Sequence, residues 1–215
     1  MNKAVIFDLD GTLIHSLPDI HQSINVMLRR FGYAEKTEKE IMNYIGNGAR
    51  KLVERSLGEG VSNDEVDKCL AFYNKIYTES GSPLTALFDG IEGVLIELKA
   101  RGNKLGILTN KPQITTDDVY KKYLQKFNFD IVVGQRKGVK CKPDKEAVMN
   151  ILNELDVSVD NAYFVGDGET DVMVAINAGI KGISVLWGYR DKSVLMQYGA
   201  EVFAEQPKDL LNLIF

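Results

Sequence analysis

Short apolar runs alternate along most of the chain with segments whose apolar residues recur at helical spacing. The runs lack a polar alternation, which is typical of strands buried on both faces of a parallel sheet. They lie at residues 4–7, 105–108, 131–133, 162–165 and 183–186. Helical patterns fill the intervals, and examples lie at residues 93–100, 145–155 and 171–178. Strands that alternate with helices predict an α/β fold whose core is a Rossmann-like, doubly wound parallel sheet.

Residues 15–86 break this alternation, because they show helical patterns and no convincing strand. In the first of these patterns, the apolar residues fall at Ile20, Ile24, Met27, Leu28 and Phe31. Gly-rich or polar breaks separate this pattern from the ones that follow. We therefore predict a helical cap domain at residues 15–86, inserted after the first strand, and a core domain made of residues 1–14 and 87–215.

Composition and charge narrow the classes of function. The chain has 215 residues, of which 45% are hydrophobic and 26% charged, as in a soluble globular protein. A net charge of −4 argues against a dedicated nucleic-acid binder. The apolar runs are too short for a membrane span or a signal-peptide core. We expect a cytoplasmic protein with no nucleic-acid or membrane partner; its oligomeric state, monomer or dimer, stays open.

Carboxylates follow the first and fourth predicted strands, at the sheet edge where parallel α/β proteins bind ligands. Asp8 and Asp10 come directly after the first strand. Because residues two apart in extended chain point the same way, both can face one site. Asp167 and Asp171 come after the fourth strand. Taken singly, Asp8 and Asp10 also suit a polar turn, and Asp167 and Asp171 suit the acidic start of a helix. A calcium loop at Asp8 and Asp10 would need further acidic positions, which are absent.

A hydroxyl, an amide and a lysine follow other strands of the same sheet. Thr109 and Asn110 precede a helix that starts with proline, and this position suits either a phosphate site or an ordinary helix cap. Lys142 lies in a loop, where a solvated charge is the plain alternative. Four carboxylates at one sheet edge would repel each other, and Mg²⁺ relieves that repulsion while it binds phosphate. The combined pattern predicts a site for Mg²⁺ and a phosphate group.

In these positions the sequence resembles the haloacid dehalogenase-like superfamily of phosphohydrolases. All four motifs of that family match in order, and they read Phe7-Asp8-Leu9-Asp10-Gly11-Thr12-Leu13, Thr109-Asn110, Lys142-Pro143 and Gly166-Asp167-Gly168-Glu169-Thr170-Asp171. The predicted helical insertion is similar to the family's cap. Residues 10–20, 45–54, 177–179 and 187–190 resemble the phosphoglycolate phosphatase group within it. The chain departs from that group's usual residues at His15, Asp144 and Gly168.

The resemblance implies a phosphatase that works through an aspartyl-phosphate. Asp8 would attack the phosphorus, and water would then hydrolyse the acyl phosphate. Asp10 would protonate the leaving oxygen and later take a proton from that water. Mg²⁺ would be held by Asp8, the backbone carbonyl of Asp10 and Asp167, with Asp171 in support. The resemblance also implies that Thr109, the Asn110 backbone and Lys142 bind the phosphate. On the cap, Arg50 is a candidate for binding a substrate carboxylate or hydroxyl, because its guanidinium suits planar anions, and a solvated arginine at a helix start is the alternative.

The substrate implied by the resemblance is a small phosphorylated metabolite similar to 2-phosphoglycolate. Several alternatives share the motifs or the outline of the fold. A β-phosphoglucomutase-like isomerase would pass the phosphoryl group to a sugar hydroxyl, and a pyrophosphatase would cleave an anhydride. A receiver-type signalling domain would keep the phosphoaspartate as a switch, but such domains lack a helical insertion and an acid two residues after the nucleophile. The Walker pattern of P-loop nucleotide hydrolases is absent.

Overall fold

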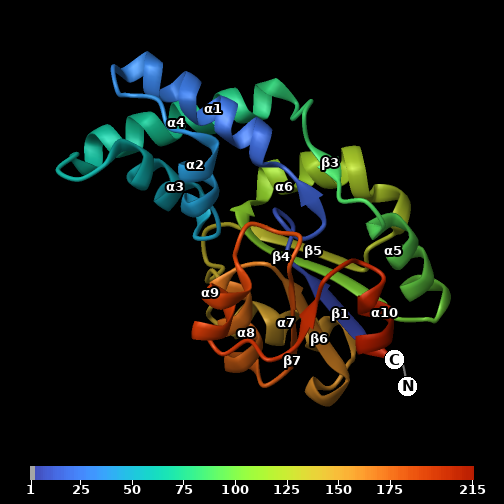
Figure 1. Cartoon of the computed structure of the whole chain (residues 1–215). Helices are drawn as coiled ribbons and strands as arrows, with labels where there is room; N and C mark the ends of the chain where they lie inside the picture. Colours follow the sequence, from blue (N-terminus) through green and yellow to red (C-terminus); the bar gives the residue numbers. More distant parts are fainter. Residues whose placement is uncertain (1–2) are drawn as a thin grey trace.

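A six-stranded parallel sheet forms the centre of the molecule (Figure 1). This computed structural model describes residues 3–215. The strands lie in the order β5-β4-β1-β6-β7-β8. Their bounds are β1 (Ala4–Phe7), β4 (Lys104–Pro112), β5 (Ile131–Gln135), β6 (Ala162–Gly166), β7 (Lys181–Val185) and β8 (Phe203–Ala204). The predicted doubly wound α/β core is thereby confirmed, and the edge strand β8 is an addition that no sequence pattern indicated.

Helices cover both faces of this sheet. They are α5 (Ile91–Ala100), α6 (Gln113–Val119), α7 (Glu146–Leu155), α8 (Glu169–Ala178), α9 (Lys192–Gln197) and α10 (Asp209–Ile214). Three short helical turns complete this part, the π-helical η1 (Tyr120–Leu124) and the 3₁₀ turns η2 (Gln125–Phe127) and η3 (Val159–Asn161). Odd-numbered residues of β1 pack with α5 and α10, and even-numbered ones pack with α7 and α8. Burial on both faces explains why β1 carries an unbroken apolar run.

Four helices follow β1 in the chain and pack around a hydrophobic cluster of their own (Figure 1). They are α1 (Leu17–Phe31), α2 (Glu38–Tyr44), α3 (Gly48–Leu57) and α4 (Asn63–Ser80). The apolar stripe predicted for α1 is buried in this cluster at Ile20, Ile24, Met27 and Leu28. Within residues 3–215, no helix is long and apolar enough to cross a membrane.

A two-stranded antiparallel ribbon, β2 (Ile14–His15) with β3 (Ala86–Leu87), connects these four helices to the sheet. Ile14 pairs with Leu87 and His15 pairs with Ala86, so the chain leaves and re-enters the core at one place. The predicted domain boundaries, between residues 14 and 15 and between 86 and 87, fall inside this ribbon. That the two parts behave as separate domains stays a prediction.

The buried carboxylate of Asp19 stabilises the connection between the four helices and the sheet. Asp19 lies in the first turn of α1 and accepts hydrogen bonds from the backbone N–H of Leu84, at 3.0 Å, and from the hydroxyl of Thr85, at 2.7 Å. Both donors belong to the segment that returns from α4 to the sheet. Asp19 therefore holds the departing and returning chains together.

Removing this carboxylate should destabilise the protein. Asp19→Ala leaves the Leu84 N–H and the buried Thr85 hydroxyl without their acceptor, so we expect the free energy of unfolding to fall by about 2 kcal/mol. Chemical denaturation of the variant and the wild type measures this change. Asp118→Ala, at an exposed position of α6, is the matched control and should change stability by less than about 0.5 kcal/mol.

Candidate active site

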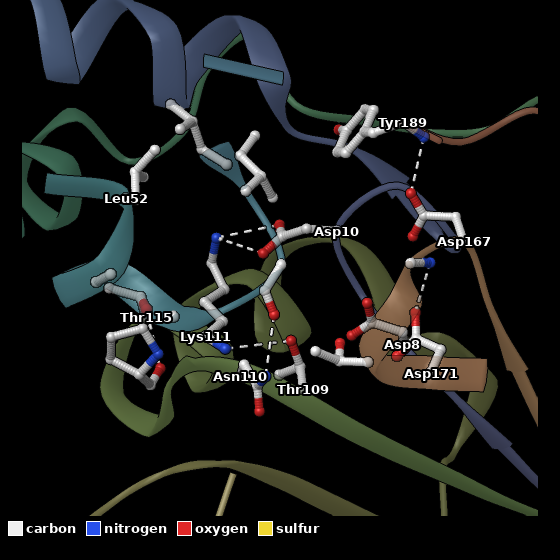
Figure 2. Close-up of a pocket in the computed structure, with 18 of the residues that line it drawn as sticks. Asp8, Asp10, Leu52, Thr109, Asn110, Lys111, Thr115, Asp167, Asp171 and Tyr189 are labelled. Atoms are coloured by element: carbon white, nitrogen blue, oxygen red, sulfur yellow. Dashed lines mark hydrogen bonds and ion pairs between the residues drawn. The ribbon is translucent and has the colours of Figure 1, made fainter. Parts of the chain in front are cut away.

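The side chains predicted to act together meet at the carboxyl ends of β1, β4 and β6, which are adjacent in the sheet (Figure 2). Asp8 follows β1, and its backbone N–H bonds the carbonyl of Val165 in β6 at 2.9 Å. The ammonium of Lys142 lies 2.8 Å from Asp8 Oδ1 and 2.6 Å from Asp171 Oδ1. All three of these charged side chains are buried. One ammonium is thus shared between two carboxylates, a geometry that fixes both in place.

Asp167 is fixed by hydrogen bonds and by close backbone packing. Its Oδ1 accepts from the Thr12 hydroxyl at 3.0 Å, and its Oδ2 accepts from the Tyr189 N–H at 2.8 Å. A Cβ added at Gly11 would lie 2.3 Å from Oδ2 of this carboxylate, and one at Gly188 would lie 2.2 Å from its Cβ. Glycine is therefore required at both positions for Asp167 to occupy its present place.

Asp171 has a different local role, because it caps helix α8. Its Oδ2 accepts from the Gly168 N–H at 2.9 Å, while its Oδ1 receives Lys142. A carboxylate at this point is favourable because the start of a helix carries partial positive charge. Both oxygens of Asp171 are engaged by the protein itself, which agrees with the supporting position expected for it.

The carboxylates of Asp8, Asp167 and Asp171 form a cluster that suits a divalent cation. One oxygen from each lies within 4.8 Å of the others. Asp8 Oδ1 is buried and faces the Lys142 ammonium at 2.8 Å. Carboxylate oxygens gathered in this way are the ligands that Mg²⁺ takes in proteins. The side chain of Asp10 points away from this cluster, so only its backbone carbonyl remains a candidate ligand.

Burial and mutual repulsion shift the pKa values of this cluster. Burial raises the pKa of Asp8 to about 7; the charge of Asp171 adds to the rise and Lys142 opposes it. Burial also raises the pKa of Asp167 to about 8, and Asp171 and Asp8 add to it. For Lys142, burial lowers the pKa, but the two carboxylates beside it outweigh burial and raise the pKa overall. Burial and the mutual repulsion of the carboxylates thus favour protonated Asp8 and Asp167, and a bound cation would displace these protons.

Asp10 is held by groups that differ from those around Asp8. The Ser16 hydroxyl donates to its Oδ1 at 2.6 Å, and the ammonium of Lys111 lies 3.1 Å from Oδ1 and 3.2 Å from Oδ2. Lys111 also donates to the hydroxyl of Tyr77 in α4 at 2.8 Å. Figure 2 shows Lys111 and Asp10 pointing toward each other in the cavity. The two carboxylates after β1 therefore have separate cationic partners.

Lys111 is a site residue to which the sequence reasoning gave no role. The sequence predicts that Thr109 and Asn110 directly precede a helix, but β4 continues to Pro112 and α6 begins at Gln113. In extended chain, residues two apart share a side. Lys111 lies two residues after the predicted phosphate ligand Thr109, and this spacing is the sequence signal that places Lys111 at the site.

Thr109 and Asn110 lie at the site, with different surroundings. Thr109 is buried, and its Oγ1 accepts from the Lys111 N–H at 3.3 Å. The side chain of Asn110 donates to the carbonyls of Gly46 and Lys142, at 2.9 and 3.1 Å, and accepts from the Lys142 N–H at 2.9 Å. The amide of Asn110 thus ties three segments together, and its backbone remains the part available to a phosphate.

Arg50 is not among the residues that line the cavity, and its role as a substrate ligand stays a prediction. Its guanidinium contacts Glu54 at 3.0 Å, Asn63 at 3.3 Å and Asp67, all within the four-helix part. These acceptors hold the side chain beside α4. The arginine that does line the cavity is Arg190.

The cavity lies between the sheet edge and the four helices (Figure 2). Asp8, Asp10 and Asp167 line it from the sheet side, and Ile20, Leu52 and Tyr77 line it from the helices. The loop after β7 joins the two sides. The Tyr189 hydroxyl accepts from the Ser16 and Leu17 N–H groups at 3.0 and 3.1 Å. Arg190 donates to the carbonyls of Met42, at 2.9 Å, and Ile45, at 2.6 Å.

Comparison with known proteins gives a consistent result. The family model described as haloacid dehalogenase-like hydrolase matches residues 5–185. The phosphoglycolate phosphatase of Vibrio cholerae serotype O1 is 31% identical over 218 residues, which cover 99% of this chain and 96% of that protein. The phosphoglycolate phosphatase of Cereibacter sphaeroides is 32% identical over 213 residues, which cover 97% of this chain and 97% of that protein.

Solved structures agree with these sequence matches. The crystal structure of a predicted phosphoglycolate phosphatase from Haemophilus somnus 129PT has a TM-score of 0.91 to this chain, at 26% sequence identity. The match covers 100% of this chain and 98% of that one. The sheet and the four-helix part are therefore similar over their whole length to those of a single known protein.

Cation binding to the metal-free protein should release protons. At pH 7, Asp8 is about half protonated and Asp167 mostly protonated, since their pKa values are about 7 and about 8. A cation favours the ionised forms, so its apparent affinity should rise from pH 6 to pH 8. Titration calorimetry with Mg²⁺ in buffers of different ionisation enthalpy measures the release. An affinity that is independent of pH across this range would contradict the prediction.

Asp167→Asn should stabilise the metal-free protein at high pH. The folded-state pKa of Asp167 is raised to about 8 from 3.8, so its contribution to stability is lost as pH rises between these values. An amide keeps the partners Thr12 and Tyr189 but never ionises. We expect unfolding free energy at pH 8.5 to rise by roughly 1–3 kcal/mol, with no difference near pH 4. Cation binding should be lost in the same variant, as calorimetry would detect.

Proposed function

Because the chain belongs to the haloacid dehalogenase-like hydrolase family, we propose that it is a Mg²⁺-dependent phosphatase that cleaves a small phosphomonoester through an aspartyl-phosphate. The family predicted from the four sequence motifs is confirmed, and the chain is a phosphoric monoester hydrolase. Relatives named phosphoglycolate phosphatase support 2-phosphoglycolate, or a substrate similar to it, as the ester. The observation that carries the proposal is the pair Asp8 and Asp10, two residues apart at one cavity but held by different lysines.

In the first half of the reaction, an oxygen of Asp8 attacks the phosphorus in line with the leaving oxygen. A bond forms between that carboxylate oxygen and phosphorus, and the bond from phosphorus to the ester oxygen breaks. Asp10 enters this step protonated, as the second half of the preceding cycle leaves it, and donates that proton to the departing oxygen, which leaves as an alcohol. Lys142 holds Asp8 at 2.8 Å and keeps the attacking carboxylate oriented. The Thr109 hydroxyl and the Asn110 backbone bind phosphoryl oxygens as charge moves onto them.

In the second half, water hydrolyses the acyl phosphate. Asp10, now ionised, takes a proton from the water as the water attacks phosphorus. The bond between phosphorus and Asp8 breaks, which returns the carboxylate and releases inorganic phosphate. Ser16 and Lys111 keep Asp10 in one position through both halves, since each contacts its Oδ1. One residue thus serves as acid and then as base.

The residues that would hold Mg²⁺ are Asp8, Asp167 and the backbone carbonyl of Asp10, with Asp171 in support. A bound Mg²⁺ would screen Asp8 from the phosphate dianion and neutralise charge as the phosphoryl group transfers. The buried carboxylate cluster, with Asp8 and Asp167 both shifted toward protonation, supports this assignment. The cluster supports a divalent cation in general, and Mg²⁺ fits because its ligands are all oxygens.

The proposal is tested by phosphate release from a panel of esters with and without Mg²⁺, using the wild type and Asp8→Asn. The panel contains 2-phosphoglycolate, sugar phosphates, a nucleotide and pyrophosphate. We expect Mg²⁺-dependent release with a preference for 2-phosphoglycolate. Asp8→Asn removes the nucleophile and should lower turnover by at least about a thousandfold. Asp144→Asn, at an exposed site, is the control and should remain near wild type.

The same panel separates the alternatives. Asp8→Asn turnover within tenfold of wild type would exclude the aspartyl-phosphate mechanism. A changed sugar phosphate without free phosphate would indicate an isomerase, and preference for pyrophosphate would indicate a pyrophosphatase. A phosphoaspartate that survives for minutes would favour a receiver-type switch. Preference for a different ester would keep the mechanism and reject 2-phosphoglycolate.

A further inference from the structure

Lys111 is a buried cation beside Asp10 in the cavity, where it positions the proposed acid and also faces the space for the leaving group. Its side chain is 5% exposed, and it lines the cavity beside Asp10. The ammonium contacts both oxygens of Asp10, at 3.1 and 3.2 Å, and the hydroxyl of Tyr77 at 2.8 Å. Tyr77 belongs to α4, so Lys111 lies where the sheet and the four helices meet. Burying an ammonium is costly unless charged or polar partners compensate it.

The two buried lysines of the cavity region face different ends of a substrate. Lys142 contacts Asp8, the proposed nucleophile, so its charge acts on the phosphoryl group. Lys111 contacts Asp10, the proposed acid, so its charge acts on the departing oxygen and on the atoms attached to it. Besides orienting Asp10, a cation at that end favours a leaving group that itself carries negative charge. The ion pairs therefore indicate an anionic leaving group.

Building on the proposed phosphatase function, we propose that Lys111 determines specificity by binding a carboxylate of the leaving group, one carbon away from the ester oxygen. An ammonium has three donors, so Lys111 can contact Asp10, Tyr77 and a substrate carboxylate at the same time. The Tyr77 hydroxyl accepts from Lys111 and can donate its own proton to the same carboxylate. In this proposal Lys111, rather than Arg50, binds the substrate carboxylate.

The remainder of the cavity fits a short leaving group of this kind. Ile20, Ile45 and Leu52 line it from the helical side, and Tyr73, Asn74 and Tyr77 of α4 lie there as well. The three aliphatic side chains offer no hydrogen bonds to the hydroxyls of a sugar, and buried hydroxyls without partners lower affinity. A short hydroxy acid places its one charged group near Lys111 and presents little other polar surface. The cavity thus favours a phosphorylated hydroxy acid over a phosphorylated sugar.

The test compares two esters that differ only in the group facing Lys111. They are 2-phosphoglycolate, which ends in a carboxylate, and 2-hydroxyethyl phosphate, which ends in a hydroxymethyl group. We expect the wild type to prefer 2-phosphoglycolate in kcat/KM by about 10- to 150-fold, as for a charge-assisted hydrogen bond. Lys111→Met removes the charge and should abolish most of this preference. Lys111→Arg should keep part of it.

Ser16→Ala is the matched control, because Ser16 also donates to Asp10 Oδ1 but carries no charge. It should lower kcat/KM for both esters by the same factor and leave their ratio within about twofold of wild type. If Lys111→Met also lowers both esters equally, Lys111 only positions Asp10 and the proposal is overturned. A wild type that cleaves both esters equally overturns it without any variant. Release from neither ester would instead reject the phosphatase function itself.

Discussion

The buried ammonium of Lys142, shared between Asp8 and Asp171, is the interaction on which the site depends. Two carboxylates so close together would repel each other in a low-dielectric interior, and Asp167 beside them adds a third negative charge. Burial first, and then the negative charges of the neighbouring carboxylates, raise the pKa values of Asp8 and Asp167. The buried cluster therefore carries an excess of negative charge, which suits a divalent cation.

The sheet topology makes this arrangement possible. The central strand β1 has β4 and β6 as neighbours, so three chain segments that are far apart in sequence end side by side. Glycines then let these segments approach more closely than any side chain would allow, as at Gly11 and Gly188 around Asp167. Backbone packing thus fixes the positions of the carboxylates, and packed backbone moves less than a flexible side chain would.

Much of the core and its motifs could be predicted from the sequence, because buried strands and the residues that follow them leave local patterns. The apolar run of β1 and the spacing of Asp8 and Asp10 are examples. Features that depend on distant contacts could not be predicted. The two-residue strand β8 is too short to show a period, and the extension of β4 past Thr109 depends on pairing with β5. Arg50 is held by Asp67, a partner seventeen positions away in the chain.

The ribbon of β2 and β3 defines the axis about which the four helices would rotate in any motion relative to the sheet. Both chain crossings lie together there, so rotation about the ribbon is the relative motion that strains the backbone least. Rotation about this axis would most strongly stretch the hydrogen bonds that join the two parts across the cavity, such as those of Asn110 with Gly46 and of Arg190 with Ile45. These few hydrogen bonds would set the force needed to swing the four helices, and with it the pace at which substrate enters and product leaves.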